Sequence, residues 1–417
     1  MNVWYYVSES EVNVSEYRNN YTQTTLEVQS LETINEEIYV YIIVEIKDLN
    51  TQASYSGDIE WVMMLKQEDP YIIENTATGT KITSQSNENI YVSPAAGSTF
   101  TYGNQTYTTN GEYVMVEGGQ SVTLTGTASY ADGVSVQTTK PSDLATKKFY
   151  AAYGAYPQTY VGEALNTTLK SANLTATGKS YTTDINGAII VLDEYEYNGV
   201  KYAKLDEKSK YTGSNVTFSD GTAVANNATY FFYVEPIAVK AMEVDANGAK
   251  VMAVNILGSM AFDQDANDWQ TSDLRTFLNG TFLSEAGLAD IAQSITITNE
   301  DYFGYAANSG NTIDQIWLPS AEEIIFWSGS GSEGFETFKN DMGLGDDYNS
   351  YRNITPSDMA IATYCYYKTY DVGYYFLRSA GYLNYYVCLV GNVGDVYTSS
   401  FYTYKDFGFS PAFYINL

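Results

Sequence analysis

The side chains available for chemistry in this 417-residue chain are limited by one absence, because the sequence contains no histidine. Ser-His-Asp and Cys-His catalysis, histidine general bases and histidine-ligated metals are therefore excluded. An enzyme built on this chain would have to use carboxylates, tyrosine, lysine or the two cysteines, Cys365 and Cys388. Two cysteines in a chain of this length do not make a disulfide framework, although they could form one bridge.

Neither the cysteines nor the acidic residues form a recognisable catalytic motif. Lys368 is the only basic residue close to either cysteine in the sequence, which gives little support for a reactive thiolate. With 50 acidic residues, some pair will always have the spacing used in glycoside hydrolysis, and no motif selects one. Asp263, Asp265, Asn267 and Asp268 begin like a calcium loop but lack the later glycine and glutamate of an EF-hand. We expect a solvated loop before a helix, no cofactor, no metal and no enzymatic activity.

The charge balance excludes some classes of partner. The chain has 50 acidic and 21 basic residues, for a net charge of −29. Nucleic acids and anionic membrane surfaces both require clustered Lys and Arg, so neither is an expected partner. No apolar run is long enough to predict membrane insertion. The opening MNVWYYVSES lacks the features of a signal peptide. We expect an extracellular or cell-surface protein whose signal has been removed, or alternatively a phage virion protein.

The first third of the chain has the pattern of a β-sandwich. Strands are predicted in IYVYIIVEI (38–46), in IEWVMML (59–65) and on both sides of Gly118-Gly119. Short strands with polar turns predict an immunoglobulin-like sandwich over residues 25–140, loosely similar to modules on bacterial surfaces. Residues 1–24 are predicted to be an extra strand or a segment that pairs with another subunit. A homo-oligomeric or surface-fibre partner therefore stays open.

The remainder mixes strands and helices. A polar stretch at 138–150 predicts the domain boundary. Hairpins are predicted at Asn198-Gly199 and Asn247-Gly248, and closing strands over 374–417. This order predicts an α+β domain over residues 148–417 and a chain that is mainly β overall. Four helices are predicted: from Thr271 or Ser272 to Gly280, over 284–295, from the capping box Ser320-Ala321-Glu322-Glu323, and from Ser357.

Five segments, in order along the chain, carry a resemblance to a known family. They are YGAYPQTYV (153–161), WQTSDLRTFLNGTFL (269–283), IWLPSAEEI (316–324), YYFLRSAG (374–381) and SPAFYINL (410–417). Together they resemble a widespread bacterial domain of unknown function, and the similarity spans roughly residues 148–417. One position departs from the family pattern, because Ser410 stands where the family has arginine.

The resemblance implies that a C-type-lectin-like domain of the formylglycine-generating-enzyme type follows the immunoglobulin-like sandwich. This fold is shared with the variable proteins of diversity-generating retroelements, whose C-terminal segment is mutated at adenines to create new binding surfaces. Formylglycine-generating enzymes use a cysteine pair in the same fold, so an enzyme stays among the alternatives. Arg275 and Arg378-Ser379 lie in the family motifs and are expected to be buried scaffold, because guanidinium groups suit forked hydrogen bonds.

The C-terminal segment is rich in tyrosine. Residues 348–417 hold 15 of the 41 tyrosines. Strand propensity explains some of them, but many are adjacent or two apart in segments broken by Gly and Asn, so they cannot all face one core. Tyrosine mixed with Ser, Gly and Asn is typical of a paratope. Randomising both adenines of an Asn codon never yields Trp, Met, Gln, Glu or Lys, and residues 369–404 contain none of these types.

We therefore predict a surface-displayed binding protein, such as an adhesin, whose C-terminal stretch faces outward and binds a protein or glycan on another cell. Aromatic anchors would supply its specificity. The alternatives are a pilus or surface-layer subunit, a phage receptor-binding protein, and an enzyme on the formylglycine-generating scaffold. The predicted ligand-binding and variable positions are Tyr382, Asn384, Tyr385, Tyr386, Cys388, Asn392, Asp395, Tyr397, Ser399, Ser400, Tyr402 and Tyr404.

Overall fold

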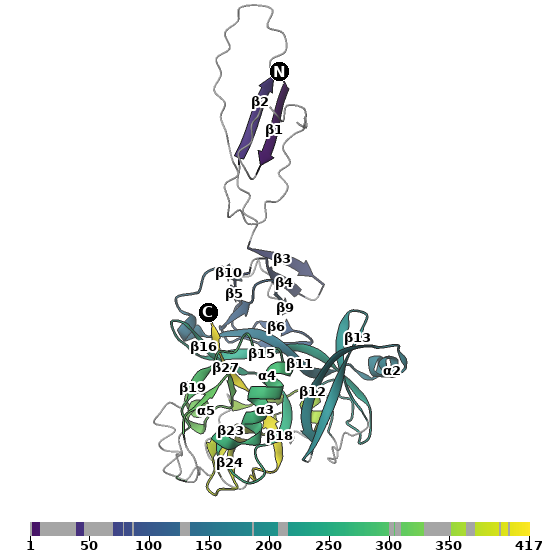
Figure 1. Cartoon of the computed structure of the whole chain (residues 1–417), viewed down its shortest axis with the longest axis vertical. Coiled ribbons are helices and arrows are strands. Elements are labelled where there is room, and N and C mark those ends of the chain that lie inside the picture. Colours follow the sequence, from purple (N-terminus) through teal and green to yellow (C-terminus); the bar gives the residue numbers. More distant parts are fainter. Residues whose placement is uncertain are drawn as a thin grey trace, which may run out of the picture. The chain divides into compact units, whose positions relative to one another are not determined.

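The computed structural model is mainly β, as the sequence predicts, and its chain divides into two compact units, Met1–Gln67 and Glu68–Leu417 (Figure 1). The structure describes residues 2–8, 39–45, 70–77, 79–85, 87–125, 134–185, 187–206, 216–299, 304, 310–328, 352–363, 372–391, 393–398 and 401–417. No helix in these segments is long and apolar enough to span a membrane.

The first unit contains an antiparallel pair of strands. β1 (Asn2–Ser8) pairs along its whole length with β2 (Tyr39–Glu45). The strand expected at 38–46 is therefore present, but its partner is the N-terminal strand. The expected 25–140 sandwich is consequently divided between the two units at Gln67. The strand predicted at 59–65 lies outside the described residues.

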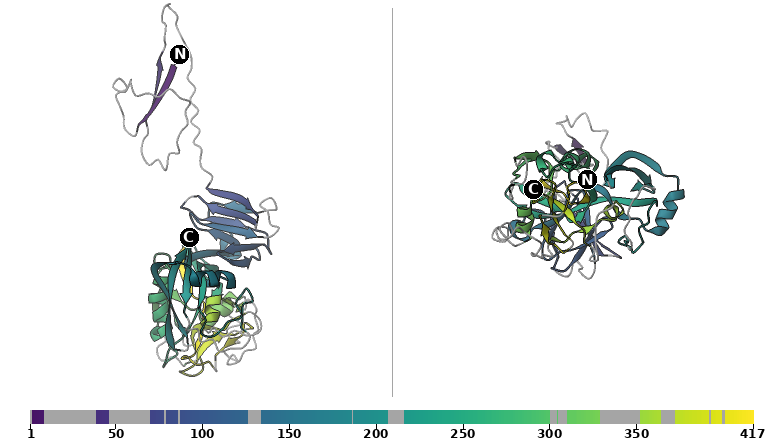
Figure 2. Two further views of the ribbon diagram at one scale, coloured as in Figure 1. Left: turned by 90° about the vertical axis from the view of Figure 1, so that its right-hand side faces the viewer. Right: turned by 90° about the horizontal axis from the view of Figure 1, so that it is seen from below.

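The second unit begins with two layers of β-strands, seen stacked in Figure 2 (left). One layer is a five-stranded sheet in the order β3-β4-β9-β6-β7, and the other contains β5, β8 and β10. The core between the layers is apolar and includes Ile82, Phe100 and Leu124. The strands are β3 (Tyr71–Thr76), β4 (Gly79–Ser84), β5 (Ile90–Ser93), β6 (Thr99–Tyr102), β7 (Gln105–Thr108), β8 (Tyr113–Val116), β9 (Ser121–Thr125) and β10 (Ser135–Gln137).

The predicted boundary at 138–150 is crossed by a continuous sheet. β11 pairs in parallel with β8, through Phe149↔Tyr113 and Tyr150↔Val114, so backbone hydrogen bonds join the sandwich to the later strands. The large sheet runs β10-β5-β8-β11-β15-β14-β13-β12. In addition, β16 pairs with β15, β27 pairs with β16, and β21 pairs with β27. Its further strands are β11 (Phe149–Tyr160), β12 (Thr175–Ile185), β13 (Ala188–Tyr197), β14 (Val200–Leu205), β15 (Tyr230–Val244), β16 (Gly248–Ala253), β21 (Ile316–Trp317) and β27 (Ala412–Asn416).

A buried carboxylate strengthens this junction. Glu235 on β15 is 3% exposed and accepts hydrogen bonds from both the backbone and the side-chain nitrogen of Asn104, at 2.6 and 2.8 Å. It also accepts from the backbone nitrogen and the hydroxyl of Thr159, at 3.1 and 2.6 Å. One side chain thus ties the β6–β7 turn to β11 and β15.

Both predicted hairpins are present. Asn198 and Gly199 have φ values of 52° and 76°, as a two-residue type I′ turn requires, and they join β13 to β14. The second hairpin turns one step earlier than predicted. Its turn is organised by Asp245, whose carboxylate accepts hydrogen bonds from the backbone of Asn247 and Gly248, at 2.7 and 2.9 Å.

The helices partly follow the prediction. Ser320 forms the expected capping box, and Ser357 caps its helix through Ala360 N. The helix predicted from Thr271 or Ser272 does not end at Gly280, because the chain continues through a π-helical turn that buries Phe282. The helix predicted over 284–295 is wrong beyond Glu285, since Gly287 takes a φ of 67° that ends it. The helices are α1 (Leu144–Lys147), α2 (Glu163–Ser171), η2 (Trp269–Thr271), α3 (Asp273–Phe277), η3 (Leu278–Phe282), α4 (Leu283–Glu285), α5 (Ala321–Trp327) and α7 (Asp358–Ala362).

A second, smaller sheet carries the C-terminal part of the chain. Its order is β18-β26-β23-β24-β25, and β23 and β24 lie at the end of this unit opposite the sandwich strands β3 and β4 (Figure 1). All residues of β23, β24 and β26 are buried. The remaining strands are β17 (Asn255–Ile256), β18 (Gly258–Ala261), β19 (Ile295–Ile297), β20 (Thr312–Asp314), β22 (Thr355–Pro356), β23 (Tyr375–Ala380), β24 (Val387–Val390), β25 (Val396–Tyr397) and β26 (Asp406–Phe409).

Candidate ligand-binding surface

Two turns of the C-terminal segment lie side by side beyond the ends of β23 and β24. Gly381 N donates to Tyr386 O at 2.9 Å, which closes the first turn. Thr403 N donates to Tyr385 O at 3.0 Å, and Tyr386 forms an isolated antiparallel bridge with Tyr402. These backbone contacts hold residues 381–386 against residues 402–404.

The two turns bring a group of tyrosines together, here called the tyrosine face: Tyr382, Tyr385, Tyr386, Tyr402 and Tyr404. The rings of Tyr385 and Tyr402 are nearly parallel, at 18° with centroids 5.8 Å apart. Tyr386 packs against both, at 4.7 and 5.1 Å, and Tyr404 lies 5.1 Å from Tyr402. Aromatic contacts of this kind contribute about 0.5–1.5 kcal/mol each, so the rings are partly ordered before any ligand binds.

The tyrosine face combines large exposed rings with a neutral character. Tyr382, Tyr385, Tyr402 and Tyr404 are 37–43% exposed, and no other described tyrosine is exposed to this extent. A hydrogen bond with Tyr402 raises the pKa of Tyr386, which therefore stays protonated at neutral pH. One charged group lies close to this face, because Lys405 Nζ lies 5.4 Å from the centre of the Tyr404 ring. Such a surface offers apolar area and hydroxyl groups with little net charge.

Two predicted contact residues are buried, and the expectation that they face outward is wrong. Cys388 is 0% exposed in the centre of β24, where its thiol donates to Ala380 O at 3.4 Å. Burial raises the pKa of Cys388, so the thiol is protonated and inert. Asp395 is 1% exposed in a tight turn, and its backbone oxygen accepts from Gly391 N at 2.8 Å. Cys388 belongs to β24, the strand that follows the first tyrosine-bearing turn, and Asp395 belongs to the turn between β24 and β25.

The remaining predicted contact residues differ in their exposure, and some lie outside the described residues. Asn384 is exposed at the tip of the first turn. Tyr397 is half-buried and packs on Phe401 at 5.1 Å and on Tyr374 at 6.5 Å, which makes it part of the supporting layer. Asn392, Ser399 and Ser400 lie outside the described residues, as does Cys365.

The acidic stretch at 263–268 supports the tyrosine face, and the expectation of a solvated loop is wrong for two of its members. Asn267 and Asp268 are 1% and 2% exposed. The side-chain nitrogen of Asn267 donates to Leu383 O at 2.9 Å, which fixes the first tyrosine-bearing turn. The Asp268 carboxylate accepts from Gln270 N at 3.0 Å and caps η2. Asp263 stabilises the same loop by accepting from the backbone of Asp265, at 2.7 Å.

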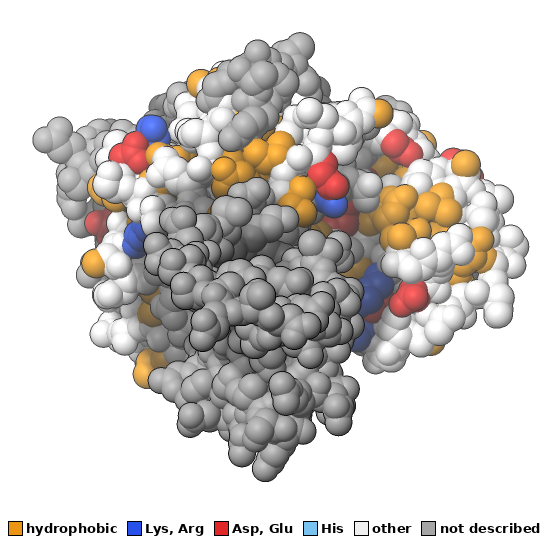
Figure 3. Space-filling view, turned by 90° about the horizontal axis from the view of Figure 1, so that it is seen from above, with side chains coloured by type: hydrophobic (Ala, Val, Ile, Leu, Met, Phe, Trp, Pro, Cys, Tyr) orange, Lys and Arg blue, Asp and Glu red, His pale blue; other side chains and the backbone are white. Residues whose placement is uncertain are grey.

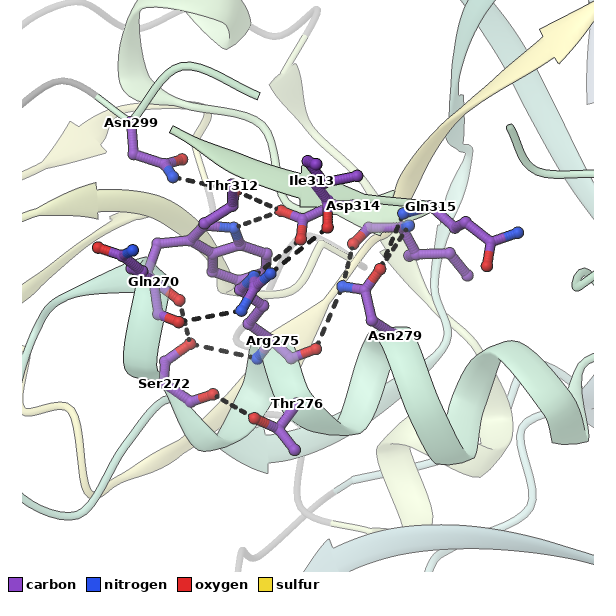
Figure 4. A network of polar contacts seen from close by, with 12 residues as sticks. Gln270, Ser272, Arg275, Thr276, Asn279, Asn299, Thr312, Ile313, Asp314 and Gln315 are labelled. Atoms are coloured by element: carbon purple, nitrogen blue, oxygen red, sulfur yellow. Dashed lines mark hydrogen bonds and ion pairs between the residues drawn. The ribbon is translucent and has the colours of Figure 1, made fainter. Parts of the chain in front are cut away.

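The helix after this loop is anchored by the network in Figure 4. Asp314, whose side chain is fully buried, accepts from Arg275 Nε at 2.8 Å and from Thr312 Oγ1 at 2.7 Å. Its other donor is the indole nitrogen of Trp269, at 3.0 Å. Asn279 bridges the helix to the Ile316 carbonyl oxygen at 2.7 Å. Arg275 therefore has the scaffold role that the sequence predicts.

Arg378 is also scaffold, as predicted. Its guanidinium is 5% exposed, donates to Leu318 O at 2.8 Å and forms an ion pair with Glu323 of α5. Burial would raise the pKa of Glu323, but the Arg378 charge and hydrogen bond outweigh burial, and the pKa is lowered. The neighbouring Ser379 accepts from Ala321 N at 2.9 Å. Strand β23 is thereby locked to the start of α5.

Two further structural residues complete this scaffold. Ser410, the position where the resemblance predicts an arginine, is buried and donates to Ala253 O at 2.8 Å, so it forms no ion pair here. Sequence patterns did not single out Arg352, which is 1% exposed and donates to Gly394 O at 3.1 Å and to Ser328 Oγ at 2.9 Å. The scarcity of arginine could have pointed to Arg352 as a structural residue, since the chain has only four arginines.

Comparison with known proteins gave one partial match, to the C-terminal part of the chain. A family model described as a domain of unknown function (DUF6273) matches residues 249–417. This range contains the Asp314 network, the Arg378 ion pair and the whole tyrosine face. No curated protein and no solved structure matched the chain.

Proposed function

We propose that this protein is a surface-displayed binding protein whose tyrosine face contacts a protein or glycan on another cell. The observation that carries the proposal is that the most exposed tyrosines of the described chain gather on one face, although tyrosines occur throughout the sequence. Large rings with few rotatable bonds give contact area at a small entropic cost. Clustered exposed aromatic residues are also unusual on a surface without a partner.

The construction of the surface supports recognition over chemistry. The exposed rings lie on turns next to fully buried strands. Hydrogen bonds from Arg352, Arg378 and Asn267 to backbone carbonyl oxygens fix these strands and turns. Loops on a rigid scaffold are the usual location of binding residues. The inert Cys388 and the lack of histidine remove cysteine-based and histidine-based catalysis from this face. An enzyme on the formylglycine-generating scaffold is therefore the weaker alternative.

The finer fold assignment is part of the same proposal. The two-layer strand packing of residues 70–137 supports an immunoglobulin-like module, and the five ordered family motifs support a C-type-lectin-like domain after it. The N-terminal strand β1 is already paired with β2, which makes its insertion into a neighbouring subunit less favourable. On the described part of the face in Figure 3, Lys and Arg are scattered beside Asp and Glu and form no large basic patch. The whole chain has 50 acidic and 21 basic residues, which supports a partner other than a nucleic acid.

We further propose that this segment is diversified by adenine-directed mutation. The exposed positions Tyr382, Asn384, Tyr385, Tyr402 and Tyr404 would tolerate variation, because their side chains lie outside the core. Variation at Cys388 or Asp395 would disturb buried packing instead, because both side chains are buried. A near-copy of the 3′ coding end that differs only opposite adenines, beside a reverse transcriptase, would support diversification. A neighbouring region without that copy would contradict diversification but leave the binding proposal intact.

The binding proposal is tested with full-length chain labelled for glycan arrays and for flow cytometry on intact bacterial cells. We expect Tyr385→Ala/Tyr402→Ala to lose at least about tenfold in apparent affinity, since hot-spot tyrosines contribute about 2 kcal/mol or more. Tyr385→Phe/Tyr402→Phe keeps the rings and separates ring contacts from hydroxyl hydrogen bonds. Tyr195→Ala, on β13, serves as the control for a half-buried tyrosine elsewhere. Unchanged binding by a stably folded double-alanine variant would refute the assignment.

A further inference from the structure

A cavity of about 150 Å³ lies at the junction of the sandwich and the large sheet, in a different part of the fold from the tyrosine face. It is formed where the β8–β9 turn meets the β6–β7 turn and the middle of β11. Its walls are partly apolar, with Met115, Val116 and Pro236. Cavities of this size accept molecules about as large as benzene.

One ionisable carboxylate, Glu117, lines this cavity. It lies at the end of β8, and its backbone oxygen accepts from Gln120 N at 2.9 Å in a tight turn. Gly118 is required in that turn, because a Cβ there would lie 2.4 Å from the backbone of Asn87. The turn therefore holds Glu117 in place by backbone contacts. Among the described residues, none forms a hydrogen bond or an ion pair with its carboxylate.

Glu117 is half-buried, and its surroundings partly desolvate the carboxylate without supplying a hydrogen-bond donor. Burial raises the pKa of Glu117 to about 7. The ionisable groups that face it are the phenols of Tyr102 and Tyr153, and burial raises the pKa of both, so they stay neutral. The Tyr102 hydroxyl already donates to Met115 O, at 3.1 Å. A carboxylate in this position gains most from a ligand that brings its own positive charge and N–H donors.

We propose that this cavity binds a small primary amine in its ammonium form, with Glu117 as the counter-ion. The ammonium group pairs with the carboxylate, the Tyr102 ring offers an aromatic wall, and Ser121 and Gln120 supply polar groups at the edge. The apolar walls accept a short alkyl chain. A divalent metal fits poorly, because one carboxylate does not supply the oxygen ligands that Ca²⁺ or Mg²⁺ requires. The strong negative charge of the whole chain favours any cation over an anion.

The test uses the full chain with n-propylammonium chloride as the probe, titrated by calorimetry at low ionic strength. At pH 8 we expect saturable binding, and at pH 5.5 binding about 30-fold weaker, because only about 3% of Glu117 with a pKa of about 7 is then ionised. Glu117→Gln should lose binding at both pH values. Glu74→Gln, which removes an exposed carboxylate from the same sandwich, should bind like the wild type. The uncharged analogue 1-propanol should bind at least tenfold more weakly.

Several outcomes would overturn the proposal: no binding at pH 8, equal binding by Glu117→Gln, or equal binding of 1-propanol. A second measurement covers the case in which Glu117→Gln does not fold. The side-chain carboxyl carbon of Glu117 is followed by NMR through a pH titration of the wild-type chain. Propylammonium should lower the apparent pKa of Glu117 in proportion to occupancy. An apparent pKa that is unchanged at saturating amine would show that the ligand does not pair with this carboxylate.

Discussion

Replacing Asp314 should show how much the helix that precedes the tyrosine face depends on one buried carboxylate. Asp314 receives hydrogen bonds from Trp269, Arg275 and Thr312 at 2.7–3.0 Å, and the carboxylate itself is fully buried. Asp314→Ala removes all of these acceptors at once. Asp314→Asn keeps the shape and one acceptor oxygen but removes the charge and turns an NH₂ group toward existing donors.

The expected loss of unfolding free energy depends on these contacts. Hydrogen bonds to a charged group contribute about 1.5–3 kcal/mol each when both partners are buried, and breaking a buried ion pair costs about 3–5 kcal/mol. Arg275 is 24% exposed and can recover water when its partner is lost, which lowers the cost. We expect Asp314→Ala to reduce the free energy of unfolding by about 3–4 kcal/mol, and Asp314→Asn by about 2 kcal/mol.

The assay is urea unfolding followed by tryptophan fluorescence, since Trp269 is itself a partner of the carboxylate. Asp290→Asn is the matched control, because Asp290 is exposed and should shift the unfolding free energy by less than about 0.5 kcal/mol. A double-mutant cycle with Arg275→Ala isolates the pair and should give a coupling of about 1–3 kcal/mol. A loss below about 1 kcal/mol for Asp314→Ala, with folding otherwise unchanged, would refute the scaffold role of this network.

Three further predictions concern single side chains. Glu117 has a folded-state pKa of about 7 against an ordinary value of 4.5, so its contribution to stability is largest below pH 4.5 and is lost as the pH rises toward 7. After allowance for solvent screening, urea unfolding should lose about 1–2 kcal/mol over that range, and Glu117→Gln should remove this dependence. Glu235→Ala should lower the free energy of unfolding by about 2–4 kcal/mol and lower the thermal midpoint, because four donors lose their acceptor. An unchanged midpoint would mean that the junction of the sandwich with the large sheet does not depend on Glu235. In a Cys365→Ser chain, Cys388 should resist thiol reagents at pH 8 until urea unfolds the protein, and rapid labelling of the native chain would contradict its burial.

Local sequence signals predicted the elements that depend on neighbouring residues. The capping box at Ser320 and the type I′ turn at Asn198-Gly199 are determined by hydrogen bonds within a few positions, and both are present. Gly280 misled the prediction because a glycine in a helix costs only about 1 kcal/mol, which is less than the burial of Phe282 contributes. The boundary at 138–150 was misleading for a similar reason, since the parallel pairing of β8 with β11 cannot be seen in a polar linker.

At the candidate surface, too, the sequence predicted some features and the contacts between distant segments decided others. Composition alone located the tyrosine-rich segment and the scaffold arginines, because residue type limits what can be buried or displayed. It could not separate Tyr385 from Cys388, which lie three residues apart. Tyr385 lies in the exposed turn before β24, whereas Cys388 lies within β24, whose residues are all buried. Nor could composition predict that Asn267, more than 100 residues away, holds the Leu383 carbonyl.

The sequence by itself therefore determined the mainly β class, the absence of histidine chemistry and the location of the tyrosine-rich segment. Only the tertiary structure decided which tyrosines are exposed, which acids are buried, and that Glu117 lines a cavity with no partner among the described residues. The physical reason is that exposure and desolvation arise from contacts between segments far apart in the chain, whereas caps, turns and propensities act within a few residues.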